Sequence, residues 1–449
     1  MKQTIAILCL IGASLSGFSQ DKSFDLSKYK FPNYKRHELE LNFNSSGNSS
    51  SNHLSIPSTN NSSGYTSDNA NSSFNSIMNI GYHYDHYTRK RIDWISSGLN
   101  GLYQYDKSES VNSFTKRTEP QIWGFIHSSR RNYITENKLF WEGSTYLSFN
   151  TYRIKETSNS HDNEISRNNS LTIKAYLGFG IGRIEHVNDL WQGYYILEKL
   201  RKQNSIRSDV KEEDIFEFSS FISKLKNKRF FDSRLRRIAE LQSLDSLLHK
   251  QNLIVNDDIS YFAILNDYWS FPIYFDRKTG KEFQINVSPQ FDRNYHKSTM
   301  TPSYAPTITN LVSTILFDYS KQINFYWERN FHFDITNTTL LSKNNDVEKN
   351  SPNNLIGTSA FFGYGFFPDT RTRIQLKSQY YGNEYPYYVG EDMIKGWMNN
   401  FQLSFNIAYF ISPQLQISGN ITDSTWFSAL HSRHGHDLNY NLSFRYAIF

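Results

Sequence analysis

Histidine residues near the end of the chain are the most compact group of side chains that could bind a metal ion. His431, His434, His436 and Asp437 lie close together in the sequence. His434 and His436 share a face if the backbone is extended, and imidazole and carboxylate groups are common ligands of divalent metals. The cluster falls in an expected surface loop beside the end of a strand, and an ordinary polar loop is the interpretation that we favour over a metal site.

Two pairs of histidine and aspartate could transfer protons. His83 with Asp85, and His332 with Asp334, would each share one face of an extended strand. Hydrolases that act on membrane lipids can work with isolated serine, histidine and acidic residues of this kind, so an enzyme remains a hypothesis. We favour ordinary hydrogen bonds within one face of a strand for both pairs.

Motifs of the common catalytic and cofactor sites do not occur in the sequence. There is no Gly-x-Ser-x-Gly elbow, no His-Glu-x-x-His, no P-loop and no cysteine-based metal site. Gly178, Gly180 and Gly182 fail the dinucleotide fingerprint, because Arg183 stands where the third glycine is required. We therefore expect no cofactor.

A short run of basic residues could bind anions. Arg371, Arg373 and Lys377 alternate with other residues along one expected strand, and together with Gln375 they would form a basic ladder on one face. Such a ladder could bind anionic sugars or phosphate groups. A network of salt bridges that stiffens the wall of the protein is the alternative that we prefer.

The composition restricts the class of protein. The chain of 449 residues has a net charge of +5 and no polybasic block, so nucleic acid is not an expected partner. Aromatic residues make up 16% of the chain. The cores of soluble proteins are built mostly from Leu, Ala and Val. This excess of aromatic residues therefore indicates an environment other than a soluble core.

Residues 1–20 have the layout of a secretory signal peptide. Lys2 gives a positive start, residues 4–15 are apolar, and small residues lead to an expected cleavage site near Gln20. An uncleaved N-terminal anchor is the alternative. The single cysteine, Cys9, would be removed with the signal, so we expect an exported chain without disulfides.

Alternation of apolar with polar or small residues dominates the rest of the chain. It is clearest in residues 171–182, 283–292, 401–411 and 438–448. Segments of this length suit tilted strands that cross a bilayer, and aromatic residues at their ends suit the two membrane interfaces. Soluble sandwiches also alternate, but their strands are shorter and carry fewer aromatic residues at their ends.

On these segments the chain resembles the outer-membrane β-barrels of Gram-negative bacteria, over most of residues 37–449. Its final aromatic residue, Phe449, is similar to the assembly signal in the last strand of such barrels. The resemblance implies an all-β transmembrane barrel in the bacterial outer membrane. It also implies contact with outer-membrane lipid and with the barrel assembly machinery.

We expect about fourteen antiparallel strands, with twelve to sixteen possible, and one helical insert. The domains are a signal peptide (1–20), an N-terminal periplasmic segment (21–36), strands one to six (37–184), the insert (185–262) and strands seven to fourteen (263–449). Short turns at 320–322, 367–370 and 412–413 would face the periplasm. The stretch 44–73, rich in Asn and Ser, would be a long surface loop.

Residues 185–262 repeat their apolar positions at helical spacing and predict three amphipathic helices. One covers residues 189–202, one follows a capping box at Asp209 and Glu212, and one follows a cap at Asp232. The expected core of this insert is Ile215, Phe218, Ile222, Leu225, Ile238, Leu241, Leu244 and Leu248. The insert resembles those of other outer-membrane barrels. It follows the sixth strand and would lie in the periplasm, as a plug or cap, or as a docking platform for a periplasmic protein.

The expected inner face carries similar numbers of positive and negative charges, which predicts weak ion selectivity. The residues are Lys174, Arg371, Arg373, Lys377, Arg445, Glu38, Glu40, Glu142, Asp292, Glu328 and Asp334. Arg329 lies on the apolar phase between Trp327 and Phe331, which predicts a bulge or a different register at that point.

Three functions follow from these observations. The first is an outer-membrane channel or transporter for a polar solute or glycan, with the insert as gate or docking platform. The second is an outer-membrane enzyme that acts on lipid or surface glycan. The third is a surface or assembly protein that transports nothing, and a lumen blocked by side chains would favour it.

Overall fold

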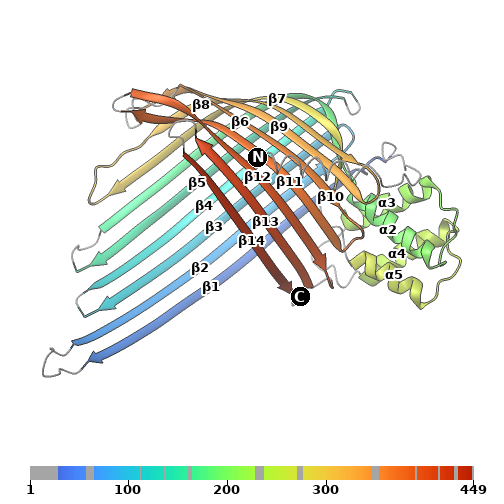
Figure 1. Cartoon of the computed structure of the whole chain (residues 1–449), viewed down its shortest axis with the longest axis horizontal. Helices are drawn as coiled ribbons and strands as arrows, with labels where there is room; N and C mark the ends of the chain where they lie inside the picture. Colours follow the sequence, from blue (N-terminus) through green and yellow to red (C-terminus); the bar gives the residue numbers. More distant parts are fainter. Residues whose placement is uncertain are drawn as a thin grey trace.

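The described part of the chain forms a single antiparallel sheet of fourteen strands in sequential order, with four helices between the sixth and seventh strands (Figure 1). The computed structural model describes residues 29–56, 65–111, 113–135, 138–159, 164–227, 237–270, 277–344, 353–389, 392–412, 415–428 and 433–446. The expected signal peptide, Cys9, Asp232, His431 and Phe449 lie outside these ranges. The predicted number of strands and the helical insert are confirmed.

The strands are long. They are β1 (Tyr34–Ile56), β2 (Tyr65–Tyr87), β3 (Arg91–Ser110), β4 (Phe114–Tyr133), β5 (Leu139–Ser158), β6 (Glu164–His186), β7 (Lys278–Ser298), β8 (Thr307–Gln322), β9 (Trp327–Lys343), β10 (Asn354–Phe366), β11 (Thr372–Val389), β12 (Asp392–Phe410), β13 (Leu415–Ser428) and β14 (Arg433–Tyr446).

The expected loop at 44–73 is wrong. β1 continues to Ile56 and β2 begins at Tyr65, and their described residues pair without interruption up to Ile56 opposite Tyr65. Strand pairing satisfies the backbone of each residue whatever its side chain, so an Asn- and Ser-rich composition does not prevent it. The expected turn at 320–322 is also displaced, because β8 ends at Gln322 and β9 begins at Trp327.

The sheet is curved, and its two faces differ. Large apolar side chains such as Leu147, Ile173 and Ile285 are exposed on one face, which we call the outer face. On the other, inner face, Arg131 of β4 reaches Glu282 of β7 at 2.6 Å. Strands three positions apart are separated by roughly 14 Å along a sheet, so their side chains meet only if the inner face is concave.

The pairing runs in series from β1 to β14, and no ladder joins β14 back to β1 in the described residues. With fourteen alternating strands the two edge strands run in opposite directions. They could therefore complete the sheet as one further antiparallel pair.

The helices are α2 (Asn188–Lys202), α3 (Glu212–Asn227), α4 (Arg237–Lys250) and α5 (Ile259–Ser270). They form a small bundle at one end of the sheet, which we call the insert end (Figure 1). The opposite end is the far end. None of the helices in the described ranges is long and apolar enough to span a membrane.

The core of the bundle follows the predicted pattern with one exception. Phe218, Ile222 and Leu248 are fully buried, and Ile215, Leu225 and Leu241 pack partly buried against them. Ile238, expected in this core, is 71% exposed at the start of α4. Tyr261, Leu265 and Trp269 of the unpredicted helix α5 contribute to the core instead. The sequence of α5 is apolar on most sides, so it lacks the polar stripe that reveals a helix.

Gly182 and Gly280 bend the ends of β6 and β7 at the point where the insert begins. Their φ angles are +108° and +128°, a region that only glycine adopts without cost. Simple alternation along β6 would point the Arg183 side chain to the outer face. The bend turns it away from that face, and the side chain is buried at the insert end.

The bulge or altered register expected at Arg329 is wrong. β9 pairs with β8 and β10 without a bulge at this residue, and the shift in register lies at Thr309 and Asn310 of β8. Arg329 therefore belongs to the outer face, where its guanidinium donates to the Tyr319 hydroxyl at 3.2 Å. Such a placement near a strand end lets a long cation reach a polar interface.

We predict that Gly182→Ala destabilises the protein. A Cβ atom at this position would lie 2.1 Å from the carbonyl oxygen of Lys281, on a backbone that alanine does not adopt. Unfolding in urea, followed by tryptophan fluorescence, should show a loss of at least about 1 kcal/mol. Gly101→Ala is the matched control, because a Cβ there meets nothing within 4 Å. Equal midpoints for the two variants would contradict this role of Gly182.

Candidate functional site

The insert end is closed by buried arginines, and the most deeply buried of them is Arg277. Its side chain has no exposed surface and lies between the rings of Trp191 and Phe367, with its guanidinium carbon 4.0 and 4.4 Å from the two ring centroids. Trp191 belongs to α2 and Phe367 to the connection between β10 and β11. Arg277 therefore joins the insert to the sheet through two cation–π contacts.

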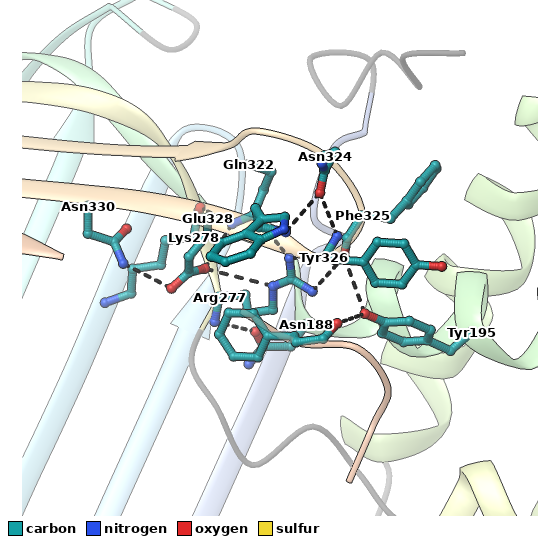
Figure 2. A network of polar contacts seen from close by, with 12 residues as sticks. Asn188, Tyr195, Arg277, Lys278, Gln322, Asn324, Phe325, Tyr326, Glu328 and Asn330 are labelled. Atoms are coloured by element: carbon teal, nitrogen blue, oxygen red, sulfur yellow. Dashed lines mark hydrogen bonds and ion pairs between the residues drawn. The ribbon is translucent and has the colours of Figure 1, made fainter. Parts of the chain in front are cut away.

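Polar partners complete the surroundings of Arg277 (Figure 2). Its guanidinium donates to the side-chain oxygen of Gln322 at 2.6 Å and to the carbonyl oxygen of Phe325 at 3.3 Å. The carboxylate of Glu328 lies 3.8 Å from its Nε. Burial lowers the pKa of Arg277, and the Glu328 carboxylate opposes this shift. Arginine is basic enough to stay charged, so the cluster is a compensated buried ion pair.

Tyr195 fixes α2 to the same two connections of the sheet. Its hydroxyl lies 2.6 Å from the carbonyl oxygen of Phe367 and 3.2 Å from that of Phe325, as Figure 2 shows for Phe325. Burial raises the pKa of the Tyr195 hydroxyl, which keeps it protonated as a donor. The neighbouring Tyr194 stacks on Phe325 with a centroid distance of 3.7 Å.

A second arginine, Arg183, lies at the end of β6. Its guanidinium donates to the carbonyl oxygens of Arg89 at 2.7 Å and Thr88 at 3.1 Å, in the connection between β2 and β3. The guanidinium also lies over the rings of Tyr87 and Tyr133, 4.9 and 4.5 Å from their centroids. Since β6 and β2 are four strands apart, these contacts cross the concave face.

Glu185 connects Arg183 to the N-terminal segment. Its carboxylate pairs with Arg183 at 3.2 Å and also with Arg89. It accepts hydrogen bonds from the Tyr87 hydroxyl at 3.2 Å and from the backbone N–H of Phe31 at 3.3 Å. The segment before β1 is thereby held against the same closed end.

The third arginine, Arg131, lies one step further into the concave face. It binds the Glu142 carboxylate through two nitrogens, at 2.6 and 2.9 Å, and Glu282 at 2.6 Å. Its guanidinium lies 4.2 Å from the ring centroid of buried Phe140. All four residues belong to strands β4, β5 and β7, so this layer does not depend on the insert.

Together these contacts define what we call the closing cluster: Arg131, Glu142, Glu282, Arg183, Glu185, Arg277, Glu328, Trp191 and Tyr195. Ion pairs and hydrogen bonds of this kind can separate and form again without covalent chemistry. The arrangement can therefore occlude one end of the concave face reversibly.

The basic ladder predicted from the sequence is divided by the structure. Arg371 pairs with Asp267 of α5 and so contacts the insert. Arg373 and Lys377 face the concave side and line a cavity of about 250 Å³, together with Asn406 and Asn420. Of the three ladder cations, Arg373 and Lys377 are the two placed to meet a solute within the sheet.

The structure describes His434 and His436 of the possible metal site and places both on a strand, not in the expected loop, while His431 lies outside the described residues. His434 and His436 lie on β14 opposite Phe427 and Thr425, and His436 contacts Asp423 at 2.7 Å. Within the described ranges no group of three or more His, Cys, Asp or Glu side chains is arranged to hold a metal ion.

The histidine–aspartate pairs form hydrogen bonds, as favoured from the sequence. His83 and Asp85 are 3.0 Å apart, and His332 bonds to both Asp318 at 2.7 Å and Asp334 at 3.0 Å. The Ser359 hydroxyl contacts the carboxylate of Asp334 instead of the imidazole. A serine nucleophile must give its proton to a base such as histidine. A serine that contacts the aspartate and not the histidine does not suit that role.

A serine–histidine pair that the sequence did not reveal lies on the concave face. His127 Nε2 is 3.1 Å from Ser144 Oγ, across neighbouring strands β4 and β5. The His127 ring packs edge-on against Trp94 with a centroid distance of 4.2 Å. Strand pairing alone brings these residues together from distant positions, so no local motif indicates them.

Comparisons with known proteins give distant matches. No family model matches the chain, and no curated protein is similar to it in sequence. The translocator domain of the autotransporter NalP from Neisseria meningitidis is 7% identical, with 85% of this chain and 94% of that chain covered and a TM-score of 0.28. The toluene transporter TodX of P. putida is 7% identical, with 92% and 90% covered and a TM-score of 0.29. The outer membrane channel DcaP of Acinetobacter baumannii is 7% identical, with 92% and 97% covered and a TM-score of 0.29. At this likeness the fold assignment rests on the fourteen strands of the chain itself.

We predict that Arg277→Met releases the insert from the sheet. The substitution keeps much of the apolar stem but leaves the buried Glu328 carboxylate without its cation, which costs about 3–5 kcal/mol for a buried pair. Hydrogen exchange at the backbone amides of α2 should become faster, while exchange in β3 to β5 should not change. Arg201→Met on the exposed side of α2 is the control. Unchanged exchange in α2 would show that Arg277 does not hold the insert.

Proposed function

We propose that the protein is an outer-membrane β-barrel channel for a polar solute, closed in its resting state at the insert end. The observation that carries this proposal is the closing cluster. It seals a concave, polar face with reversible contacts, and part of the seal is supplied by a separate helical subdomain.

The outer face supports a position in a membrane. On β6, Ile173, Leu177, Phe179 and Ile181 are 42 to 59% exposed on this face. They cover about 26 Å of strand at roughly 3.3 Å per residue. At a tilt of about 40° this is roughly 20 Å of height, most of the apolar band of a membrane barrel, which is about 25 Å tall. Exposed apolar side chains in such number are expected to contact lipid.

The edges of the sheet support closure into a barrel. Lipid offers no partner for unpaired backbone groups, so an antiparallel sheet in a membrane must close on itself. The edge strands β1 and β14 carry exposed apolar residues of the same outer phase, for example Leu41 and Leu442. Antiparallel pairing of β14 with β1 would complete the barrel.

The insert is placed to act as a gate. It contacts the β8–β9 connection through Phe325 and the β10–β11 connection through Phe367 and Arg371. On the other side, Phe216 of α3 packs against Tyr29 in the segment before β1, with a centroid distance of 5.9 Å. In a ring of fourteen strands the start of β1 and the β8–β9 connection lie on nearly opposite sides. A body anchored to both lies across the mouth of the barrel.

A second function, a barrel that transports nothing, is supported by the Arg131 layer. This layer belongs to the wall alone and would remain after removal of the insert. The two functions differ in whether displacement of the insert opens a path. The docking of a periplasmic protein on the insert, and contact with the barrel assembly machinery, remain predictions.

We predict that removal of the insert produces an open channel. His186 pairs with Lys278, so residues 187–277 can be replaced by a two-residue hairpin turn without moving β6 or β7. In planar bilayers the intact chain should show rare, brief openings, and the shortened chain should conduct steadily. Silence from both forms, with heat-modifiable folding retained, would favour the function without transport.

A single substitution gives a milder form of this experiment. Asp267→Asn removes the ion pair between α5 and Arg371 and should raise the open probability of the full-length channel. Glu213→Gln, on an exposed side of α3, removes one negative charge without touching the sheet and should have no effect.

We predict that Arg373 and Lys377 influence ion selectivity. In the shortened chain, the double variant Arg373→Glu with Lys377→Glu reverses two charges beside the cavity of about 250 Å³. The reversal potential in a salt gradient should move toward cation selectivity, because fixed charge in a narrow pore attracts counter-ions. Lys297→Glu on the outer face is the control. An unchanged reversal potential would place both residues outside the conducting path.

A further inference from the structure

Three cations lie side by side on the outer face near the far end of the sheet. Arg153 of β5 is directly opposite Arg167 of β6, and Arg167 is directly opposite Lys297 of β7. All three side chains are exposed. They share the phase of the exposed apolar residues Phe149, Ile173 and Val287 and therefore point outward. We call Arg153, Arg167 and Lys297 the outer cation row.

The row is unfavourable for the protein alone. Like charges directly opposite each other on neighbouring strands repel and destabilise the pair. The acidic residues of the same strand ends cannot relieve this repulsion. Alternation along the strands points these acidic side chains to the inner face; they are Glu156, Glu164 and Asp292. Two further exposed cations of the same outer phase, Lys155 and Arg293, increase the positive charge.

The position of the row relative to the apolar band indicates what neutralises it. Arg153 follows Phe149, and Arg167 precedes Leu171, by four positions each, or about 13 Å along a strand. A strand tilted by about 40° carries these side chains roughly 10 Å beyond the band. The headgroup layer extends roughly 5–8 Å beyond the hydrocarbon core, so these long side chains reach back into it.

We propose that the outer cation row binds the phosphate of an anionic membrane lipid in the leaflet at the far end of the barrel. The inference rests on the membrane position proposed above. The two guanidinium groups can bind phosphate oxygens through paired N–H donors, and Lys297 adds a point charge. The lipid chains then lie along the apolar side chains of β5 to β7, such as Phe149 and Ile173. This continuity of charge with apolar surface favours a lipid over free phosphate.

The test uses the exported full-length chain in nanodiscs of phosphatidylcholine with a minor fraction of phosphatidic acid. Lipids that remain bound after detergent extraction are identified by native mass spectrometry. The intact chain should retain phosphatidic acid in preference to phosphatidylcholine. The triple variant Arg153→Gln, Arg167→Gln and Lys297→Gln should retain at least about tenfold less of it at low salt.

The control variant carries Lys202→Gln, Lys224→Gln and Lys250→Gln, three exposed lysines of the helices. It changes the net charge equally and should retain the lipid as the intact chain does. The pair Arg153→Lys with Arg167→Lys keeps the charge and should also retain it. Equal retention by the triple variant and the intact chain would overturn the proposal, and so would displacement of the lipid by inorganic phosphate at low concentration.

Heat-modifiable migration in gels is measured for every variant and separates two kinds of failure. A chain that does not fold into the nanodisc overturns the proposed membrane position itself. A chain that folds there but shows no preference for phosphatidic acid overturns only the outer cation row.

Discussion

Antiparallel pairing of every strand with its sequential neighbour is the constraint on which the rest of this protein depends. It satisfies the backbone hydrogen bonds along strands of 13 to 23 residues and fixes the register of each residue against its neighbours. Side chains are then divided strictly between two faces. The exposed Ile173 and the inward-pointing Lys174 are adjacent in sequence but meet different environments for that reason.

At the insert end, buried arginines are stabilised by carboxylates and aromatic rings. Arg131, Arg183 and Arg277 are each paired with a carboxylate and each lies over one or two aromatic rings. A buried charge without such partners would be expensive, and a pair that loses one member is strongly destabilised. The layer at Arg277 joins the insert to the sheet, whereas the layers at Arg131 and Arg183 are built from strands and their connections.

Charged side chains are arranged differently at the two ends of the sheet. At the insert end, cations and carboxylates point toward each other within the concave face, and their charges cancel locally. At the far end, alternation sends Arg153 and Arg167 outward but Glu156 and Glu164 inward, so the charges are separated by the sheet itself. Charge separation of this kind persists only if each face meets a complementary environment. For the outer face, the proposed environment is an anionic lipid leaflet.

The sequence by itself determined the number of strands, their faces and the presence of a helical insert, because these follow from periods of two and of 3.6 residues within short windows. It missed the continuation of β1 and β2 through an Asn- and Ser-rich stretch, and it missed helix α5, since composition conceals both. The closing cluster and the His127–Ser144 pair were decided only by the tertiary structure. Their members come from strands and connections far apart in the sequence, and curvature of the sheet brings them together. Curvature depends on long-range pairing and on the bends at Gly182 and Gly280, for which no local pattern gives the direction.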